Sequence, residues 1–382
     1  MDNKPIRILH VVGRMDRGGI ETMLMNLYRH IDRDKVQFDF LAHYGREAAY
    51  NEEIRALGGR IYEMPALRDE HRVYYWRVFS YIRALERFFR EHREYRIVHG
   101  HMTNTACFYM AAAKRHGVEC RIAHSHTTRR KSGLCGIVTD ILQRFICFFA
   151  TDYFACSDAA LRWICPECIA HSGKVHIFRN AIDAKRFCFD PERRADLRRK
   201  MDLEGKLAIA CVGRFRPEKN QIFLIEVLER LRSKGQDAVI LFAGDGPCME
   251  AVMRRADEAG LHGNVRFLGD CSDIPGVLLA ADVLALPSLW EGMPMTLVEG
   301  WASGLRCVIS DRLDKAVDSL GMVKRVSLDD PDGWAEALIR AVKAGRKDTT
   351  KDVQAAGYDI NTTAPWLENF YIEKYNGTDR KP

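Results

Sequence analysis

Short apolar segments rich in β-branched residues alternate with longer amphipathic segments along almost the whole chain. One amphipathic segment, at residues 20–31, carries an apolar face at helical spacing, formed by Met23, Leu24, Leu27 and Ile31. This alternation is typical of parallel sheets covered by helices, because a parallel crossover needs a connection about as long as a helix. The pattern therefore predicts an α/β fold.

The strand candidates fall into two sets. The first set lies at residues 7–13, 38–44, 60–66, 95–101, 120–126, 152–157 and 174–180, and the second at residues 207–213, 238–244, 265–269, 282–288, 307–311 and 322–328. A charged, turn-rich segment between the sets predicts a boundary near residue 190. We expect two Rossmann-like lobes facing across a cleft, residues 1–189 and 190–361, with a C-terminal helix at 362–376 that packs back on the first.

The composition, with 47% hydrophobic and 29% charged residues, is that of a soluble globular protein and excludes fibrous and disordered classes. The formal net charge of +6 is too small to require a nucleic-acid partner, and none is expected. A strand-like run begins by Ile6, too early for a secretory signal, so a cytoplasmic protein is expected. The 12 cysteines are then interpreted mainly as reduced thiols.

Three junctions between a strand and a helix carry candidate ligand-binding residues, because open parallel sheets bind ligands beyond the carboxyl ends of their strands. The first, "GRMDRGGIET", has Gly18 and Gly19, which allow the backbone to approach a ligand. The second, "VGRFRPEKN", supplies Arg214 and Lys219. The third is "WEGMPMTLVEG" at residues 290–300. Together these residue types indicate a diphosphate ligand.

The third junction holds two carboxylates on either side of a Gly-Met-Pro turn. Pro294 favours the first turn of a helix, so Glu291 is expected on the loop and Glu299 inside the helix. The first amides of that helix are expected to point back into the loop and to favour an anion there. They belong to Met295, Thr296 and Leu297.

Two cations account for a diphosphate without a metal ion. A full positive charge about 4 Å from a phosphate oxygen contributes roughly 4 kcal/mol at an effective dielectric near 20. Arg214 and Lys219 would thus stabilise a diphosphate leaving group. The Asp-x-Asp triplets, Asp32/Asp34 and Asp330/Asp332, lie in turn-like settings where solvated caps are the commoner explanation. No metal site and no cofactor are therefore expected.

The ordered motifs of this chain resemble those of the retaining GT-B glycosyltransferases of family 4 over nearly the whole length. The matching stretches are "GGIE", "ACSDAA", "RNAID", "GRFRPEKN", "GDGP" and the pair Glu291 and Glu299. The chain looks most similar to enzymes that build bacterial exopolysaccharide or capsule. The resemblance implies a metal-independent, retaining hexosyltransferase with a nucleotide-sugar donor, expected to be a UDP-sugar, and a glycan or lipid-diphosphate-linked acceptor.

The resemblance also implies a role for each candidate residue. Arg214 and Lys219 match residues that hold the diphosphate, and Gly18 and Gly19 match the glycine loop that approaches it. Glu299 matches the carboxylate that accepts hydrogen bonds from the ribose. Glu291 and the backbone of Gly292, Met293, Pro294 and Met295 match the group that positions the donor sugar. In the family this group also stabilises charge near the anomeric carbon of the sugar.

His126 in "AHSH" matches the first-lobe histidine that faces the sugar and acceptor. In this family the departing phosphate oxygen is thought to help take the acceptor proton, so His126 is expected to position substrate rather than to act as a general base. Three other histidines compete for a role: His99, His101 and His124. A further group has a Cys-x2-Cys start but not the usual zinc-finger spacing, so a solvated or structural interpretation is favoured: Cys165, Cys168, His171 and His176.

A basic loop with Arg129, Arg130 and Lys131 lies near the aromatic stretch "RFICFFA". A solvated charged face is the default interpretation of such a run. An enzyme that acts on a lipid-diphosphate acceptor must nevertheless visit an anionic surface, so peripheral contact with the inner face of the cell membrane is a second hypothesis.

Two other functions compete with sugar transfer. A nucleotide-binding dehydrogenase would share the sheets, but "GDGPCM" lacks the last glycine of the Gly-x-Gly-x-x-Gly fingerprint. A catalytically inactive nucleotide-sugar-binding partner subunit of another glycosyltransferase would keep the fold. The presence of both glutamates and both cations favours an active enzyme.

Overall fold

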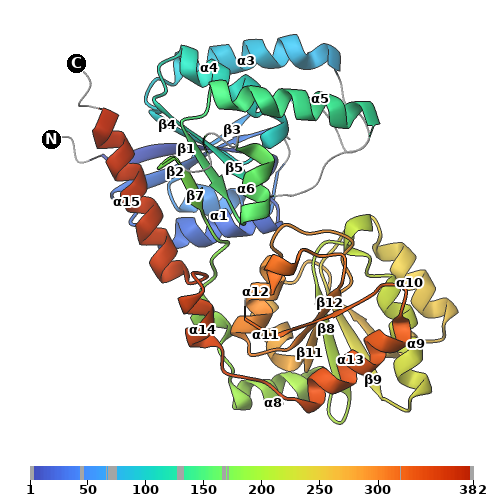
Figure 1. The fold of residues 1–382 in the computed structure, drawn as a ribbon. Coiled ribbons are helices and arrows are strands. Elements are labelled where there is room, and N and C mark those ends of the chain that lie inside the picture. Colours follow the sequence, from blue (N-terminus) through green and yellow to red (C-terminus); the bar gives the residue numbers. More distant parts are fainter. Residues whose placement is uncertain are drawn as a thin grey trace. The chain divides into compact units, whose positions relative to one another are not determined.

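The computed structural model describes residues 4–43, 47–65, 67, 75–126, 133–165, 169, 172–318 and 320–378. The chain divides into two compact units, one formed by residues 1–181 with 360–382 and the other by residues 182–359. Each unit has its own parallel sheet (Figure 1). The predicted α/β class with two Rossmann-like sheets is confirmed.

The first unit contains a 7-stranded sheet in the order β3-β2-β1-β4-β5-β6-β7. All of its neighbouring strands pair in parallel. The predicted strands are all present, with the following bounds: β1 Ile6–Val12, β2 Val36–Ala42, β3 Ile61–Glu63, β4 Ile97–Gly100, β5 Cys120–Ser125, β6 Asp152–Ala155 and β7 Val175–Ile177.

Helices cover both faces of this sheet (Figure 1). One face carries α3 (Val78–Glu91), α4 (Ala106–Arg115) and α5 (Gly133–Arg144), which pack on one another. The C-terminal helix α15 (Ile360–Thr378) packs against α1 (Gly19–His30) and contacts β1, β2 and β4. Shorter elements complete the unit: α2 Asn51–Ala56, α6 Asp158–Ile164, and the 3-10 turns η1 Tyr75–Arg77, η2 Thr103–Thr105 and η3 Phe145–Phe148.

The second unit contains a 6-stranded parallel sheet in the order β10-β9-β8-β11-β12-β13. Its strands again occupy the predicted segments: β8 Leu207–Val212, β9 Ala238–Ala243, β10 Val265–Phe267, β11 Val283–Leu286, β12 Cys307–Ser310 and β13 Val323–Val326. The central strands β8, β9, β11 and β12 are apolar and buried on both faces, as expected for strands covered by helices on each side.

The helices of the second unit build its core against this sheet. α9 (Phe223–Ser233) packs on α13 (Pro331–Lys343), and Trp334 is fully buried between them and the sheet. The remaining helices and 3-10 turns are α8 Pro191–Lys200, α10 Met249–Glu258, α11 Ile274–Ala280, α12 Met295–Ala302, α14 Thr350–Ala355, η4 Ala184–Phe187, η5 Pro217–Lys219, η6 His262–Asn264 and η7 Lys315–Val317.

The polar segment from which a boundary near residue 190 is expected lies inside the second unit. It forms η4 and α8, which contact α12 and α11 respectively. The unit begins at Ile182, before the expected boundary near residue 190, because Ile182 N–H donates to Tyr358 O at 2.9 Å and joins the two ends of the unit. Local polarity alone does not reveal this backbone pairing.

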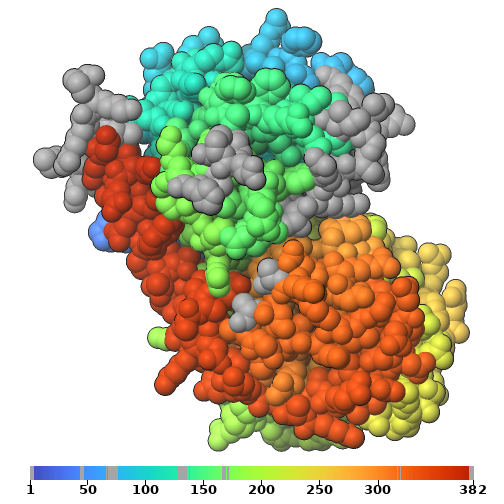
Figure 2. All heavy atoms as spheres, viewed as in Figure 1, coloured from blue at the N-terminus to red at the C-terminus, as the bar shows by residue number. Residues whose placement is uncertain are grey.

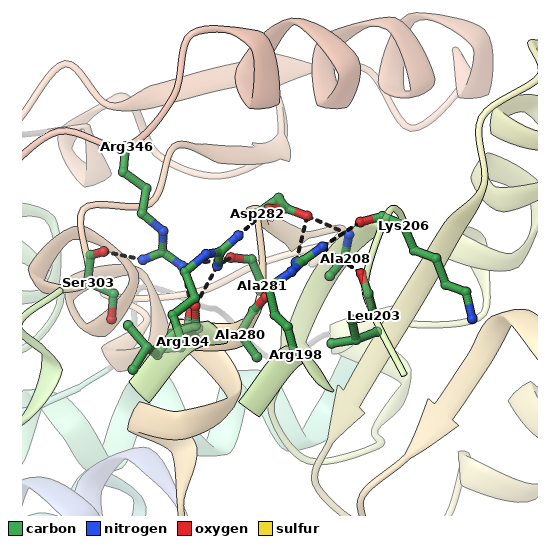
Figure 3. A network of polar contacts seen from close by, with 12 residues as sticks. Arg194, Arg198, Leu203, Lys206, Ala208, Ala280, Ala281, Asp282, Ser303 and Arg346 are labelled. Carbon is green, nitrogen blue, oxygen red and sulfur yellow. Dashed lines mark hydrogen bonds and ion pairs between the residues drawn. The ribbon is translucent and has the colours of Figure 1, made fainter. Parts of the chain in front are cut away.

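One carboxylate fastens α8 to the sheet of the second unit (Figure 3). Asp282, just before β11, accepts hydrogen bonds from Arg194 at 2.5 Å and from Arg198 at 3.1 Å. It also accepts the N–H of Ala208 at the start of β8, at 2.8 Å. Arg346 lies beside this network and donates to the carbonyl groups that end α11, including those of Leu278 and Leu279. The network therefore ties three segments that are distant in the sequence.

Candidate functional site

The candidate site of the second unit lies at the carboxyl ends of β8 and β11. These two strands are neighbours in the sheet although β9 and β10 separate them in the chain. The strand order reverses at this point, and open α/β sheets bind ligands outside such a switch point. The loops that follow β8 and β11 carry the predicted residues Arg214, Lys219 and Glu291.

Lys219 and Glu291 form an ion pair at this switch point. Lys219 Nζ lies 2.5 Å from Glu291 Oε1, and the two side chains are only 23% and 13% exposed. Ser288 Oγ donates to the same carboxylate oxygen at 2.9 Å. The backbone joins the two loops as well, since Leu289 N–H donates to Glu218 O at 2.8 Å. The structure thus brings together two residues that were predicted separately.

Arg214 is exposed on the same loop as Lys219, and a buried side chain fixes the backbone of this loop. The buried side chain of Gln221 donates to the carbonyl of Arg214 at 3.0 Å and to that of Gly213 at 3.3 Å. Sequence reasoning missed Gln221 and Ser288. Gln221 lies shortly after Lys219 in the sequence, and Ser288 lies shortly after β11. Glutamine and serine are common residue types, so neither indicates a site until the fold is known.

The "GDGP" loop packs against the loop after β8. A Cβ on Gly244 would lie 2.2 Å from the carbonyl oxygen of Gly213, and one on Gly246 would lie 2.4 Å from that of Phe215. Both glycines also have positive φ, +141° and +154°. Only glycine fits such a close approach. This motif therefore supports the loop that carries Arg214 and Lys219.

Helix α12 begins at Met295 with Pro294 as its N-cap, as predicted. The first turn differs from the expectation in one respect, because Leu297 N–H donates to Pro294 O at 3.0 Å. Leu297 is therefore not free to bind a ligand, and the expected anion-binding amides reduce to those of Met295 and Thr296. Gly292 and Met293 form the turn before the helix, where Met293 is buried.

Glu299 lies inside α12 and is 8% exposed. Burial raises the pKa of its carboxyl to about 7, although the positive charge of Arg186 in η4 opposes this shift. A buried carboxyl group with such a pKa is a candidate for a functional site, because its cost of burial is offset when a ligand donates hydrogen bonds to it.

Gly18 and Gly19 lie in the first unit, where Gly18 is the N-cap of α1 and Gly19 its first residue. The backbone of Gly18 is extended, with φ −116°, so its conformation does not require glycine. A Cβ there would lie 2.4 Å from a carboxylate oxygen of Glu21, the end of a flexible side chain that can move aside, so the space does not require glycine either.

His126 follows β5 in the first unit and is partly exposed. Its Nε2 atom lies 2.9 Å from Nδ1 of His101. Burial lowers the pKa of His126 to about 3, so the ring is neutral at physiological pH. A neutral imidazole with so low a pKa is a weak general base, which agrees with the expected positioning role.

Several predicted residues lie outside the described part of the chain: Arg129, Arg130, Lys131, Cys168 and His171. Of the remaining members of the Cys/His group, Cys165 is buried just after α6 and His176 lies in β7. In the described residues, the groups that bring three possible metal ligands together consist of other histidines.

Two family models match this sequence. The model described as Glycosyltransferase Family 4 matches residues 17–186, and the model described as Glycosyl transferases group 1 matches residues 206–344. EpsF of Bacillus subtilis (strain 168), which is named as a glycosyltransferase, is 35% identical over 380 residues, covering 97% of each chain. CapH of Staphylococcus aureus, named as a capsular polysaccharide biosynthesis glycosyltransferase, is 22% identical over 97% of this chain and 99% of its own.

A third relative is the UDP-Gal:alpha-D-GlcNAc-diphosphoundecaprenol alpha-1,3-galactosyltransferase of Escherichia coli. It is 28% identical over 267 residues, which are 65% of this chain and 66% of that protein. Among solved structures, Anabaena Alr3699/HepE in complex with UDP-glucose aligns with a TM-score of 0.77 at 14% identity. That alignment covers 96% of this chain and 99% of HepE, and it shows that the two share the GT-B fold.

Proposed function

This chain belongs to glycosyltransferase family 4, and from that premise we propose that it transfers a sugar from a UDP-sugar to a glycan or lipid-diphosphate-linked acceptor in bacterial surface polysaccharide synthesis. The anomeric configuration is retained in this proposal. The names of two relatives support the substrates, since one uses UDP-Gal with a diphosphoundecaprenol-linked sugar and the other acts in capsule synthesis.

The observation that carries the proposal is the ion pair of Lys219 with Glu291 at the switch point of the second sheet. Cleavage of a sugar–phosphate bond leaves extra negative charge on the diphosphate and positive charge on the sugar ring. Lys219 is a cation that can stabilise the negative charge on the diphosphate, and the adjacent Glu291 carboxylate can stabilise the positive charge on the sugar ring. Arg214 adds a second cation for the diphosphate, and Met295 and Thr296 add amides at the start of α12.

The transfer needs no metal ion in this proposal. Two cations that reach the diphosphate supply the charge that a divalent ion supplies elsewhere, at roughly 4 kcal/mol each for an effective dielectric near 20. The departing phosphate oxygen takes the proton of the acceptor hydroxyl. In the metal-free enzyme His126 orients substrate as a neutral ring, and Gly18 and Gly19 keep the roles that the resemblance implies.

The experiment that tests this function measures the release of free UDP from a panel of UDP-sugars after treatment of the protein with a chelator. We expect release that increases when a lipid-diphosphate-linked glycan is added. Binding of UDP-sugar without release under every condition would instead support the inactive partner subunit. Release that requires added Mg²⁺ or Mn²⁺ would contradict the metal-independent mechanism.

Glu299→Ala is expected to weaken UDP-glucose binding by about ten- to a hundredfold, because hydrogen bonds to a charged group contribute about 1.5–3 kcal/mol. The wild-type affinity should also depend on pH. The ribose hydroxyls donate to the ionised carboxylate, whereas burial holds its pKa at about 7 in the free protein. Binding must therefore expel a proton below pH 7, and the dissociation constant should rise about tenfold from pH 8 to pH 6.

Calorimetry over this pH range checks the prediction, and Glu299→Gln is its control. The amide keeps the shape of the side chain but does not titrate, so the variant should bind weakly with little change between pH 6 and pH 8. UDP-glucose is a suitable probe because its diphosphate is a diester without an ionisation near pH 7. An equal pH dependence in the variant would assign the titration to another group.

We further propose that the first unit contacts an anionic membrane surface. The segment that contains α5, coloured green, lies at the surface of the first unit (Figure 2). On η3, at the end of α5, Phe148 is 64% and Phe145 is 48% exposed. A cation lies nearby, since Lys114 of α4 donates to the carbonyl of Phe148 at 3.2 Å. Aromatic and basic side chains together are typical of interfacial contact. Among the described residues, no helix has the length and apolar character needed to cross a bilayer.

Pelleting with vesicles that contain anionic lipid tests this contact. The double variant Phe145→Ser, Phe148→Ser should pellet less than the wild type, and charge reversal of Arg129, Arg130 and Lys131 should have the same effect. Ile222→Ser is a matched control, because Ile222 is an exposed apolar residue of the second unit. Equal pelleting of all these proteins would remove the membrane proposal.

A further inference from the structure

Five histidines gather at the carboxyl ends of three neighbouring strands in the first sheet. His10 comes from β1, His99 and His101 from the end of β4, and His124 and His126 from the end of β5. The order β1-β4-β5 makes these strand ends adjacent. Four of the five rings are at most 6% exposed, and only His126 is partly exposed. The proposed transfer reaction uses only His126.

Hydrogen bonds between imidazoles connect three of these rings. His10 Nδ1 lies 3.1 Å from His101 Nε2, and His101 Nδ1 lies 2.9 Å from His126 Nε2. His101 thus has one nitrogen directed to a buried ring and the other directed to the partly exposed ring. The nitrogen that faces His126, Nδ1, therefore lies on the side of His101 nearer the surface of the unit.

A second chain of hydrogen bonds connects the other two rings to α15. His124 Nδ1 lies 3.0 Å from His99 Nε2, and His99 Nδ1 lies 2.6 Å from the hydroxyl of Tyr371. Both nitrogens of His99 are therefore engaged. The remaining nitrogen of His124, Nε2, is buried and has no hydrogen-bond partner among the described residues. Such an unpaired buried polar atom is costly unless a ligand satisfies it.

One ring nitrogen from each of His101, His124 and His126 lies within 4.8 Å of one from each of the other two. We propose that these three side chains form a binding site for a divalent transition-metal ion that prefers imidazole ligands, with zinc as the expected ion. The hydrogen bonds assign the ligand atoms as His101 Nδ1, His124 Nε2 and His126 Nε2. A water molecule or an anion completes the coordination beside the partly exposed His126.

One pair of the proposed ligand nitrogens already has nearly the spacing that an ion requires. Two nitrogens bound to one tetrahedral zinc lie about 3.3 Å apart, as follows from a zinc–nitrogen distance near 2.0–2.1 Å. His101 Nδ1 and His126 Nε2 are already 2.9 Å apart. When the ion binds between these two nitrogens, the ring that carried the shared proton holds it on its other nitrogen, so both imidazoles stay neutral.

The surrounding hydrogen bonds orient the proposed ligands. When His101 binds through Nδ1, its Nε2–H donates to His10 Nδ1. When His124 binds through Nε2, its Nδ1–H donates to His99 Nε2, and His99 Nδ1–H then donates to Tyr371. Partners of this kind fix the tautomer of a metal-bound histidine.

A neighbouring set, His10, His99 and His101, also meets the distance criterion. It is a poorer site for two reasons. Binding there would take a nitrogen of His99 away from Tyr371 or His124, which are not ligands of that set, whereas the favoured set gives up only a bond between two of its own ligands. All three of its rings are buried, so a doubly charged ion would have no solvent-side position for a water or an anion.

Titration of the tag-free, chelator-stripped full chain with Co²⁺ tests the proposal. We expect one Co²⁺ per chain with the intense visible absorption of tetrahedral cobalt, displaced by one equivalent of Zn²⁺. His126→Asn, which changes the most exposed ligand and so disturbs packing least, should weaken cobalt binding at least tenfold. His124→Asn should do the same.

His43→Asn is the matched control. His43 is a buried histidine of the same unit that bonds to Tyr81 and to the backbone of Val12, outside the cluster. This variant should bind cobalt like the wild type. Absence of the visible absorption in the wild type, or an unchanged titration of His126→Asn, would overturn the proposal. Because metal uptake is measured directly, the result does not depend on whether sugar transfer is observed.

Discussion

Lys219→Met is expected to lower the turnover of sugar transfer by about a hundred- to a thousandfold. Removing one group that stabilises developing negative charge typically costs about this much. The side chain is largely enclosed and pairs with Glu291, so water cannot readily supply the missing charge. The substitution also leaves the Glu291 carboxylate with Ser288 as its remaining hydrogen-bond donor in this cluster. Single-turnover kinetics with a saturating UDP-sugar would separate this loss from weaker binding.

Lys206→Met is the matched control for this experiment. Lys206 also belongs to the second unit and forms an ion pair, with Asp202 at 2.7 Å, but it lies outside the site. Its replacement should leave turnover unchanged. A Lys219→Met enzyme with normal turnover and weaker donor binding would contradict the role proposed for the ion pair.

Glu291 provides the second half of this test. Glu291→Ala should mainly lower turnover, whereas Glu299→Ala should mainly weaken nucleotide binding. The double variant Lys219→Met, Glu291→Ala should lose less activity than the sum of the two single effects, because residues in direct contact are coupled. The reverse pattern for the two glutamates would show that their roles are exchanged.

Asp282→Asn is expected to destabilise the second unit by about 3 kcal/mol. Breaking a buried ion pair by removing one partner costs about 3–5 kcal/mol, and the low end applies because Asp282 is 17% exposed. The amide leaves the guanidinium groups of Arg194 and Arg198 without their counter-charge. Hydrogen exchange should then show lost protection of β8 and α11, the segments that this network joins to α8.

Asp202→Asn serves as the control for this stability prediction. Its ion pair with Lys206 is largely solvated, since the Asp202 side chain is 81% exposed. Exposed pairs contribute about 0–1 kcal/mol, so exchange rates should hardly change. If Asp282→Asn behaved like this control, the network in Figure 3 would contribute little to the stability of the unit.

The strands and most helix starts followed from the sequence because they depend on local pattern. The apolar runs that predict β1–β13 are a property of neighbouring residues, as is the preference of Pro294 for the start of α12. The junction residues Arg214, Lys219 and Glu291 were also identifiable, because chemistry-bearing side chains follow strands at recognisable positions. The limit of this reasoning appears at Leu297, whose amide is used within its own helical turn.

The sequence by itself determined that this protein has two parallel α/β sheets and that charged residues stand at the carboxyl ends of particular strands. Only the tertiary structure decided which of those ends meet. It paired Lys219 with Glu291, buried Glu299 enough to raise its pKa to about 7, and assembled His101, His124 and His126 from two strands. The physical reason is that spacing along the chain sets the period of an element, whereas contacts and burial depend on which strands become neighbours in the sheet.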